Sequence, residues 1–224
     1  MYQELFDKKH QFYRLTKPNP DSKNYSKLPT GEYEGNILCF ECDNVQIGRL
    51  EDYARRVMYG GELKESEPLK VVNKVDSNGI RYTHIQNINY KKFKLFLLSI
   101  LWRASISKRN FFSNVYLGPY EETIRQMIIN EDPKEPYDFP CLLITIRRDE
   151  PIASQIIKSP TKLKEERCTK YHFFICGISY VFHVPKHNLP DYLFEGVINK
   201  SNEMKIFHIP KDKVKEALAV LLGF

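Results

Sequence analysis

The feature that most constrains this fold is an apolar segment, LFLLSILW, near the middle of the chain. It occupies residues 95–102 of 224, within a stretch from about Tyr90 to Ile106 whose middle is apolar on every side. A helix on a protein surface keeps one polar face, so an all-round apolar helix predicts a buried position. We therefore expect a central helix that runs through the core. The run is far shorter than the ~18 apolar residues of a membrane span, so no membrane partner is expected.

Amphipathic helices are expected on either side of this segment. Apolar residues recur at three- and four-residue steps over 47–58, and Gly60-Gly61 is a typical helix stop. Pro119, followed by Tyr120 and two glutamates, favours the start of another helix that runs to about Asn130. A closing helix is expected over 211–222.

Short β-favouring runs predict antiparallel strands. LKVVNKV and IRYTHIQNI flank Asp76-Ser77-Asn78-Gly79, in which Asn-Gly supplies the positive φ angles of a hairpin turn. Two strands are expected around Asp7-Lys8-Lys9, whereas residues 17–35 and 158–170 are expected to be loops. Further strands are expected at 141–146, 171–175, 178–184 and 204–209. Because helices and strands do not alternate regularly, the sequence predicts an α+β fold.

Charge and cysteine content narrow the functional classes. The net charge of +6 and the pI of about 8.9 suit an anionic partner such as DNA or RNA, and equally suit simple solubility. Five cysteines at irregular spacing do not make a disulfide framework. The first residues show no signal peptide, so we expect a cytoplasmic, reduced protein.

Cys39 and Cys42 form a Cys-x-x-Cys pair directly before the helix expected at 47–58. Two thiolates at this spacing commonly supply two of four Zn²⁺ ligands. The other cysteines lie more than 90 residues downstream and form no second close pair, so the pair is interpreted as half of a zinc site. A chain without a cofactor is therefore favoured over one that holds Zn²⁺. A redox dithiol receives less support, because the βαβ context of such motifs is missing. The plainest interpretation is two partly buried cysteines that begin a helix.

Cys168, Cys176, His183 and His187 could also be considered as a Cys₂His₂ set. Pro185 separates the two histidines, and the cysteines are eight residues apart across a strand. Only matched spacing makes such clusters specific, so ordinary strand residues are the favoured interpretation.

Basic residues gather at both ends of the central helix and are candidates for nucleic-acid contacts, or for the solvated turns of a buried helix. They are Lys91, Lys92, Lys94, Lys108 and Arg109. Arg103 differs, because it interrupts the apolar run and needs an acidic or carbonyl partner. A charge network is expected with Glu121, Glu122 and Arg125, with a structural ion pair favoured over a catalytic carboxylate.

No standard catalytic motif is present: the sequence has no P-loop, dinucleotide glycine pattern, nucleophile elbow or HExxH. The order of several segments does resemble a bacterial group of HNH-like, treble-clef proteins over residues 1–130. The matching segments are ELFDKKHQFYRL, ILCFECDNVQIGRLEDYARRVMYGG, YKKFKLFLLSILWRASIS and FFSNVYLGPYEETIRQM.

The resemblance implies a treble-clef-like segment over 1–62 and an α+β main domain over 63–224, or one continuous domain. In that group a first Cys-x-x-Cys and a histidine segment precede the part equivalent to Met1, and the histidine serves as general base beside a metal. Both are missing from this sequence. We therefore expect a nucleic-acid-associated protein without catalytic residues in this chain. The alternatives are a protein-interaction module and an enzyme with a site around Arg103, Glu121 and Glu122.

Overall fold

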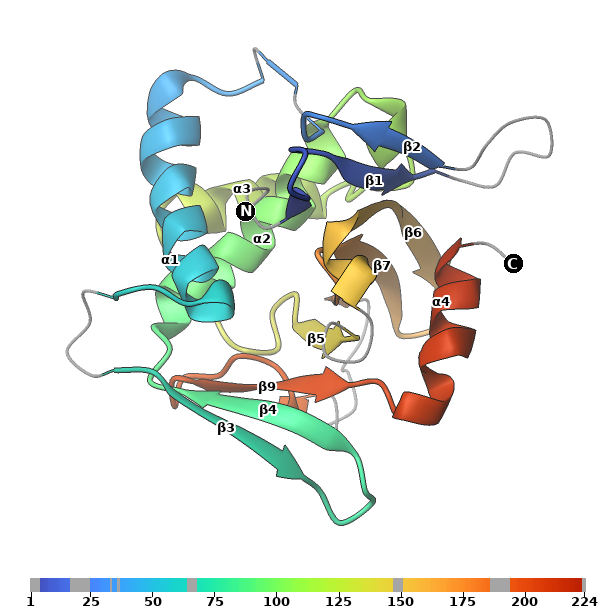
Figure 1. The fold of residues 1–224 in the computed structure, drawn as a ribbon. Coiled ribbons are helices and arrows are strands. Elements are labelled where there is room, and N and C mark those ends of the chain that lie inside the picture. The colour runs from blue at the N-terminus through green and yellow to red at the C-terminus, as the bar shows by residue number, and fades with distance from the viewer. Residues whose placement is uncertain are drawn as a thin grey trace.

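The fold is α+β, as predicted. A computed structural model describes residues 5–16, 25–32, 34–35, 37–63, 68–146, 151–185 and 194–222. Within these ranges the chain forms four α-helices and one mixed sheet of nine strands. Figure 1 shows the helices α1, α2 and α3 gathered on one side of the molecule and α4 on the other.

The sheet has the strand order β2-β1-β6-β7-β8-β5-β9-β4-β3. Neighbouring strands are antiparallel except for the parallel pairs β1 with β6 and β5 with β9. The strands are β1 (Phe12–Leu15), β2 (Tyr25–Leu28), β3 (Lys70–Val75), β4 (Arg81–Gln86), β5 (Cys141–Thr145), β6 (Ile156–Lys164), β7 (Cys168–Ile175), β8 (Ile178–Pro185) and β9 (Glu203–His208).

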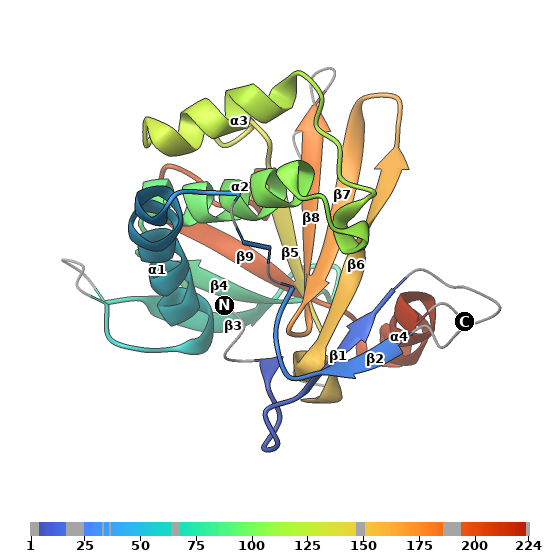
Figure 2. The same ribbon diagram turned by 90° about the horizontal axis from the view of Figure 1, so that it is seen from above.

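The central helix α2 (Tyr90–Ile106) begins and ends where the sequence predicted. Asn89 caps it, because its side-chain oxygen accepts a hydrogen bond from the Lys92 N–H at 3.0 Å. Twelve of its residues are buried, and the apolar ones among them pack with the inward-facing side chains of β7, β8, β5 and β9. The view in Figure 2 shows α2 lying across one face of the sheet between α1 and α3.

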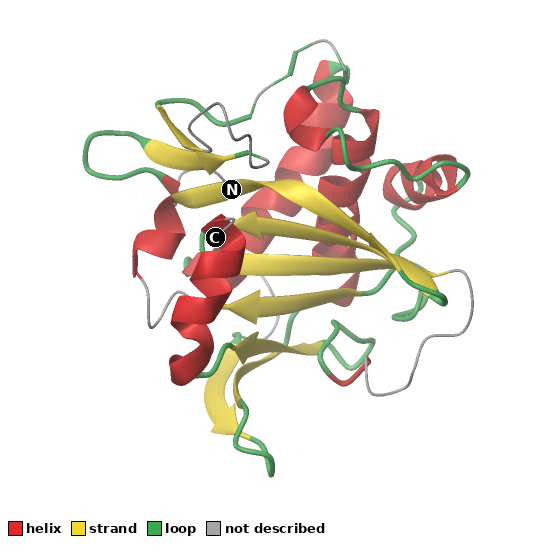
Figure 3. Cartoon of the chain, turned by 90° about the vertical axis from the view of Figure 1, so that its right-hand side faces the viewer, coloured by secondary structure: helices red, strands yellow, loops and turns green. Residues whose placement is uncertain are grey.

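The opposite face of the sheet carries a smaller core. Phe174 of β7 and Ile156 of β6 pack there with Leu15, Ile146 and Ala153, and Leu218 of α4 (Val214–Leu222) covers them. Figure 3 shows α4 in front of the sheet with α1, α2 and α3 behind it. The 3-10 helix Lys211–Lys213 leads into α4, so the expected closing helix is confirmed in two parts.

The two remaining α-helices also match their predictions. A π-helical turn, Glu41–Ile47, continues into α1 (Gly48–Tyr59), and Gly60 ends α1 with a φ of 92° that favours glycine. The helix α3 (Tyr120–Ile129) follows Pro119 directly. Two further 3-10 helices span Asn110–Phe112 and Pro151–Gln155.

Two segments predicted as loops are in fact strands. Residues 156–164 form β6, and only 165–167 connect it to β7. The lysine-rich end of β6 misled the prediction, because Lys162 and Lys164 lie in the largely exposed outer half of a strand that is buried at its start. Pro160 is accommodated where the register shifts between Lys158 and Thr161. Residues 25–28, inside the other predicted loop, form β2.

The expected N-terminal hairpin differs as well. Residues 5–10 contain no strand, residues 1–4 lie outside the described ranges, and β1 pairs with β2 instead. In the β3–β4 turn, only Gly79 takes a positive φ, of 78°, whereas Asn78 does not. The Asp76 carboxylate accepts hydrogen bonds from the Asn78 and Ile80 N–H groups and so stabilises a longer turn.

The boundary expected at residue 62 does not separate two cores. β1 lies within the single sheet, beside β6, and Leu5, Phe12 and Tyr53 belong to the same buried cluster as α2. Over the described ranges, no helix has the length and apolar character needed to cross a membrane.

Candidate functional site

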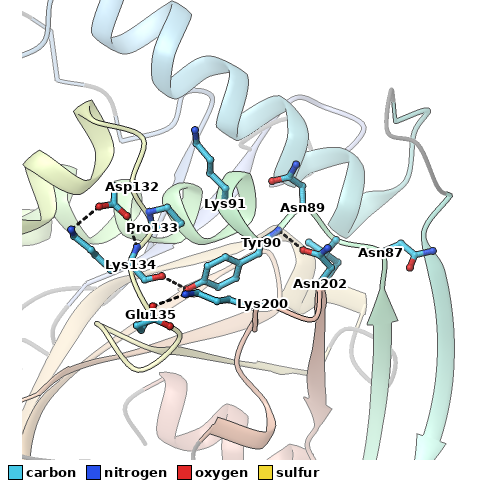
Figure 4. A pocket seen from close by; sticks show the side chains of 11 residues that line it. Asn87, Asn89, Tyr90, Lys91, Asp132, Pro133, Lys134, Glu135, Lys200 and Asn202 are labelled. Atoms are coloured by element: carbon cyan, nitrogen blue, oxygen red, sulfur yellow. Dashed lines mark hydrogen bonds and ion pairs between the residues drawn. The ribbon is translucent and has the colours of Figure 1, made fainter.

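Three connections between elements surround a polar groove at the first turn of α2. We call it the α2 groove; it has a volume of about 900 Å³ and is shown in Figure 4. The β4–α2, α3–β5 and pre-β9 segments contribute its lining, which includes Asn87, Asn89, Tyr90, Lys91, Asp132, Lys134, Glu135, Lys200 and Asn202.

Tyr90 holds these three connections together. Its N–H donates to the Asn202 side-chain oxygen at 3.2 Å, and its hydroxyl donates to the Lys134 carbonyl at 2.9 Å. Burial, and next the nearby Glu135 carboxylate, raises the pKa of Tyr90 far above its usual value, so the ring stays neutral. The neighbouring Asn89 N–H donates to the Tyr53 hydroxyl at 2.6 Å, which ties the groove to α1.

Lys91 extends away from the Tyr90 ring in Figure 4, and three lysines in all line the groove, from α2, from the α3–β5 connection and from the segment before β9. Each is about half exposed and forms an ion pair: Lys91 with Glu131 at 2.8 Å, Lys134 with Asp132 at 2.6 Å, and Lys200 with Glu135 at 2.5 Å. The lysines lower the pKa values of Glu131 and Asp132 through these hydrogen bonds. Exposed pairs of this kind contribute little free energy and open readily, so the ammonium groups can turn toward another anion.

The backbone of the groove is strained. Seven non-glycine residues in the described ranges have positive φ, and three of them, Asn87, Lys134 and Asn202, line the groove. Asparagine tolerates this conformation, but a lysine there has an energetic cost that the surrounding structure must offset. Such strain often marks functional sites.

Only part of the predicted basic set belongs to this groove. Lys91 lines it, and Lys92 lies beside it with its Nζ 5.2 Å from the centre of the Tyr53 ring. Lys94 was predicted to be exposed, which is wrong: its side chain is buried, and its Nζ donates to the carbonyls of Glu135 and Pro136 at 3.0 and 3.2 Å. Burial lowers the pKa of Lys94 to about 8.

Lys108 and Arg109 lie beyond the other end of α2. A 17-residue helix is ~25 Å long, so they cannot belong to the same groove. The Arg109 guanidinium pairs with the buried Glu32 carboxylate at 2.9 Å, and the Lys108 N–H donates to Glu34 at 3.1 Å. This end of α2 is therefore anchored to the segment before the Cys-x-x-Cys pair.

The predicted charge network around Arg103 is wrong in its partners. The Arg103 guanidinium bonds to the Glu51 carboxylate of α1 and lies 4.0 Å from Asp43. Two residues along α2, Ser105 faces the other way and donates to Glu121 at 2.9 Å. Because consecutive helical residues are rotated by ~100°, Arg103 faces α1 while Ser105 faces α3.

The other two members of that predicted network form a separate pair on α3. The Arg125 guanidinium donates two hydrogen bonds of 2.6 Å to the Glu122 carboxylate. Arg125 lowers the pKa of Glu122 to about 2. Arg103 is thus paired with α1, and within the described residues it does not pair with Glu121, Glu122 or Arg125 of α3.

Arg103 and its partners stand at the rim of a second hollow of about 480 Å³. Its floor is apolar and comes from α2, β6, β7 and the 3-10 helix Asn110–Phe112. Glu121 and Glu122 do not line it. The hollow therefore does not unite the residues of the predicted alternative enzyme site.

The Cys39–Cys42 pair lies at the start of the helix, as the sequence indicated. No group of three or more His, Cys, Asp or Glu side chains in the described ranges could hold a metal ion. Cys141, Cys168 and Cys176 are buried elsewhere, in β5, in β7 and in the β7–β8 turn. His183 lies in β8, and His187 is outside the described residues.

The groove residues from the later connections were missed by sequence reasoning. Lys134, Lys200 and Asn202 lie in loops without a motif, and only the fold brings them to α2. No family model, curated protein or solved structure matches this chain.

Proposed function

We propose that this protein binds nucleic acid through the α2 groove, with backbone phosphates against Lys91, Lys134 and Lys200. The observation that carries this proposal is that three half-exposed lysines, from three separate segments, line one groove. Lysine contacts to phosphates release counterions and supply most of the affinity in such complexes.

Two further features of the groove support an anionic ligand. It lies at the first turn of α2, where the helix dipole places partial positive charge. Its asparagine amides can hydrogen-bond to sugars, phosphates or base edges. The expected resemblance to HNH-like proteins points to the same class of partner, and we propose binding only, without cleavage.

The test is binding of labelled single- and double-stranded DNA and RNA, measured by fluorescence anisotropy across salt concentrations. We expect affinity to fall with salt, at a slope of roughly 0.7 to 0.9 per phosphate contact. A triple variant, Lys91→Gln with Lys134→Gln and Lys200→Gln, should bind weakly and lose about two to three units of that slope.

A matched control removes the same charge elsewhere. Lys211, Lys213 and Lys215 are exposed on the segment that enters α4, on the opposite side of Figure 1 from the first turn of α2. Their replacement by glutamine should leave affinity nearly unchanged. If both triple variants lost the same affinity, the nucleic acid would be attracted by net charge alone, and the α2 groove would not be the binding site. No affinity at any salt would overturn nucleic-acid binding and favour a protein-interaction module.

A further inference from the structure

The two cysteines of the Cys-x-x-Cys pair occupy the first turn of a helix that continues to Tyr59. Phe40 between them is already helical, with φ −53° and ψ −43°, and the Cys39 carbonyl accepts a hydrogen bond from the Asp43 N–H at 3.0 Å. Cys39 is therefore at the cap position, and Cys42 is three residues into the turn. Residues three apart on a helix lie on one side of it.

The Cys39 sulfur accepts a hydrogen bond within the pair. The Cys42 N–H donates to the Cys39 Sγ at 3.4 Å, as it would to a capping side chain. This bond, and next the neighbouring Cys42 side chain, lowers the pKa of Cys39, whereas the neighbouring Cys39 side chain raises the pKa of Cys42. The arrangement favours a thiolate on Cys39 and a thiol on Cys42.

The two cysteines also differ in exposure. Cys39 is exposed and Cys42 is half-buried, whereas Cys141, Cys168 and Cys176 are buried. An incoming reagent therefore reaches Cys39 first. Cβ atoms three residues apart on a helix are ~5–6 Å apart, so modest movement of the turn brings the two sulfurs to bonding distance.

We infer that Cys39 and Cys42 form a redox-active dithiol that reduces a disulfide compound and closes to an intramolecular disulfide. The Cys39 thiolate attacks one sulfur of the disulfide, forms a mixed disulfide and releases the first thiolate, which takes a proton from solvent. Cys42 then loses its proton and attacks the Cys39 sulfur, which releases the second thiol. The disulfide gains two electrons and two protons, and the pair loses them.

The βαβ context used to identify such motifs in sequence is indeed missing here, because a loop and not a strand precedes Cys39. The chemistry depends on three local features instead: an exposed attacking sulfur, a helix N-terminus and a neighbouring resolving thiol. All three are present, and none depends on nucleic-acid binding.

The test uses the full chain, equilibrated with mixtures of reduced and oxidised glutathione, then alkylated in denaturant so that buried thiols also react, digested with trypsin and analysed by mass spectrometry. Residues 28–49 carry both cysteines and no internal lysine or arginine before Arg49, so one peptide reports on the pair. We expect this peptide to lose two hydrogens and escape alkylation. The peptides with Cys141, Cys168 and Cys176 should stay alkylated, which provides an internal control.

Two single variants separate the roles. Cys42→Ser should trap a mixed disulfide with glutathione on Cys39, whereas Cys39→Ser should form the adduct on Cys42 at least about tenfold more slowly. Equal adduct rates in the two variants, or a pair that stays reduced in oxidised glutathione, would overturn the inference. So would a zinc ion on the purified protein that blocks oxidation until it is chelated.

Discussion

At the scale of single residues, Lys94 is the clearest departure from a surface lysine. It is 2% exposed, two backbone carbonyls accept its ammonium hydrogens, and burial lowers its pKa to about 8. Below pH 8 both the folded and unfolded states carry the proton. Between pH 8 and the usual value of 10.5, the unfolded state binds more protons than the folded state, so stability rises with pH.

We therefore expect a pH-dependent difference between the wild type and Lys94→Met. From pH 7.5 to 9.5, the free energy of unfolding of the wild type should rise by about 2 kcal/mol relative to that of the variant. Urea unfolding at several pH values measures this directly. Lys91→Met serves as the control, because it removes one ammonium group from a half-exposed position on the same helix. If the free energies of unfolding of wild type and Lys94→Met changed in parallel with pH, the lowered pKa of a buried Lys94 would be contradicted.

A second prediction at this scale concerns Gly196. A Cβ atom there would lie 2.4 Å from the Phe207 ring and 2.8 Å from the Leu142 side chain. Gly196→Ala should therefore lower the free energy of unfolding by about 1–3 kcal/mol. In Gly48→Ala, by contrast, the new methyl group has only an ordinary 3.6 Å contact within a helix, and we expect stability to rise by roughly 0.5–1 kcal/mol. Thermal and urea unfolding of both variants measure these two changes in stability. If Gly196→Ala were as stable as Gly48→Ala, the close packing of Phe207 and Leu142 around Gly196 would be contradicted.

At the scale of elements, the Arg103–Glu51 pair connects α2 to α1. Both side chains are about 30% exposed, so the pair is only partly screened by solvent. A double-mutant cycle with Arg103→Met and Glu51→Gln should give a coupling free energy of about 0.5–1 kcal/mol. The same cycle with Glu121→Gln should give a value near zero, because Glu121 accepts from Ser105 on the other face of α2. A coupling free energy between Arg103 and Glu121, and none between Arg103 and Glu51, would contradict this pairing and support the network predicted from the sequence.

The elements also show what sequence alone could supply. The helices α1, α2 and α3 were predictable because their apolar periodicity, caps and stops are local signals. β6 was not, because its outer half is rich in lysine, and a solvated strand end resembles a loop. Arg103 could be selected as unusual because it interrupts an apolar run, whereas the sequence groups Lys94 with the solvated lysines. The partners of both lie in loops and helices far along the chain, and only the fold determines those distances.

The same limit applies to the candidate sites. The Cys-x-x-Cys pair is contiguous and was found directly from its spacing. The α2 groove has three lysines from positions 91, 134 and 200, whose meeting depends on how α3, β5 and β9 surround the start of α2. No spacing rule joins such positions, so the groove became visible only in three dimensions.

At the scale of the whole molecule, one core extends through residues on both sides of position 62. Leu5 and Phe12 are fully buried in the same cluster as Phe93 and Leu98 of α2, and β1 is hydrogen-bonded to β6 in the single sheet. Because the segment before position 62 shares its core and its sheet with the rest of the chain, local unfolding of that segment would cost a large free energy. The chain should therefore unfold as one cooperative unit.

Phe12→Ala tests this cooperativity. Removal of this fully buried ring should lower the free energy of unfolding by about 3–5 kcal/mol. Trp102, the single tryptophan, lies in α2 and reports on the centre of the molecule, whereas far-ultraviolet circular dichroism reports on all elements. Both signals should show the same urea midpoint in the wild type, and both should shift equally in the variant. If the Trp102 transition stayed at its wild-type midpoint while the dichroism signal moved, the N-terminal segment would be a separate folding unit, because the core around α2 would then survive without it.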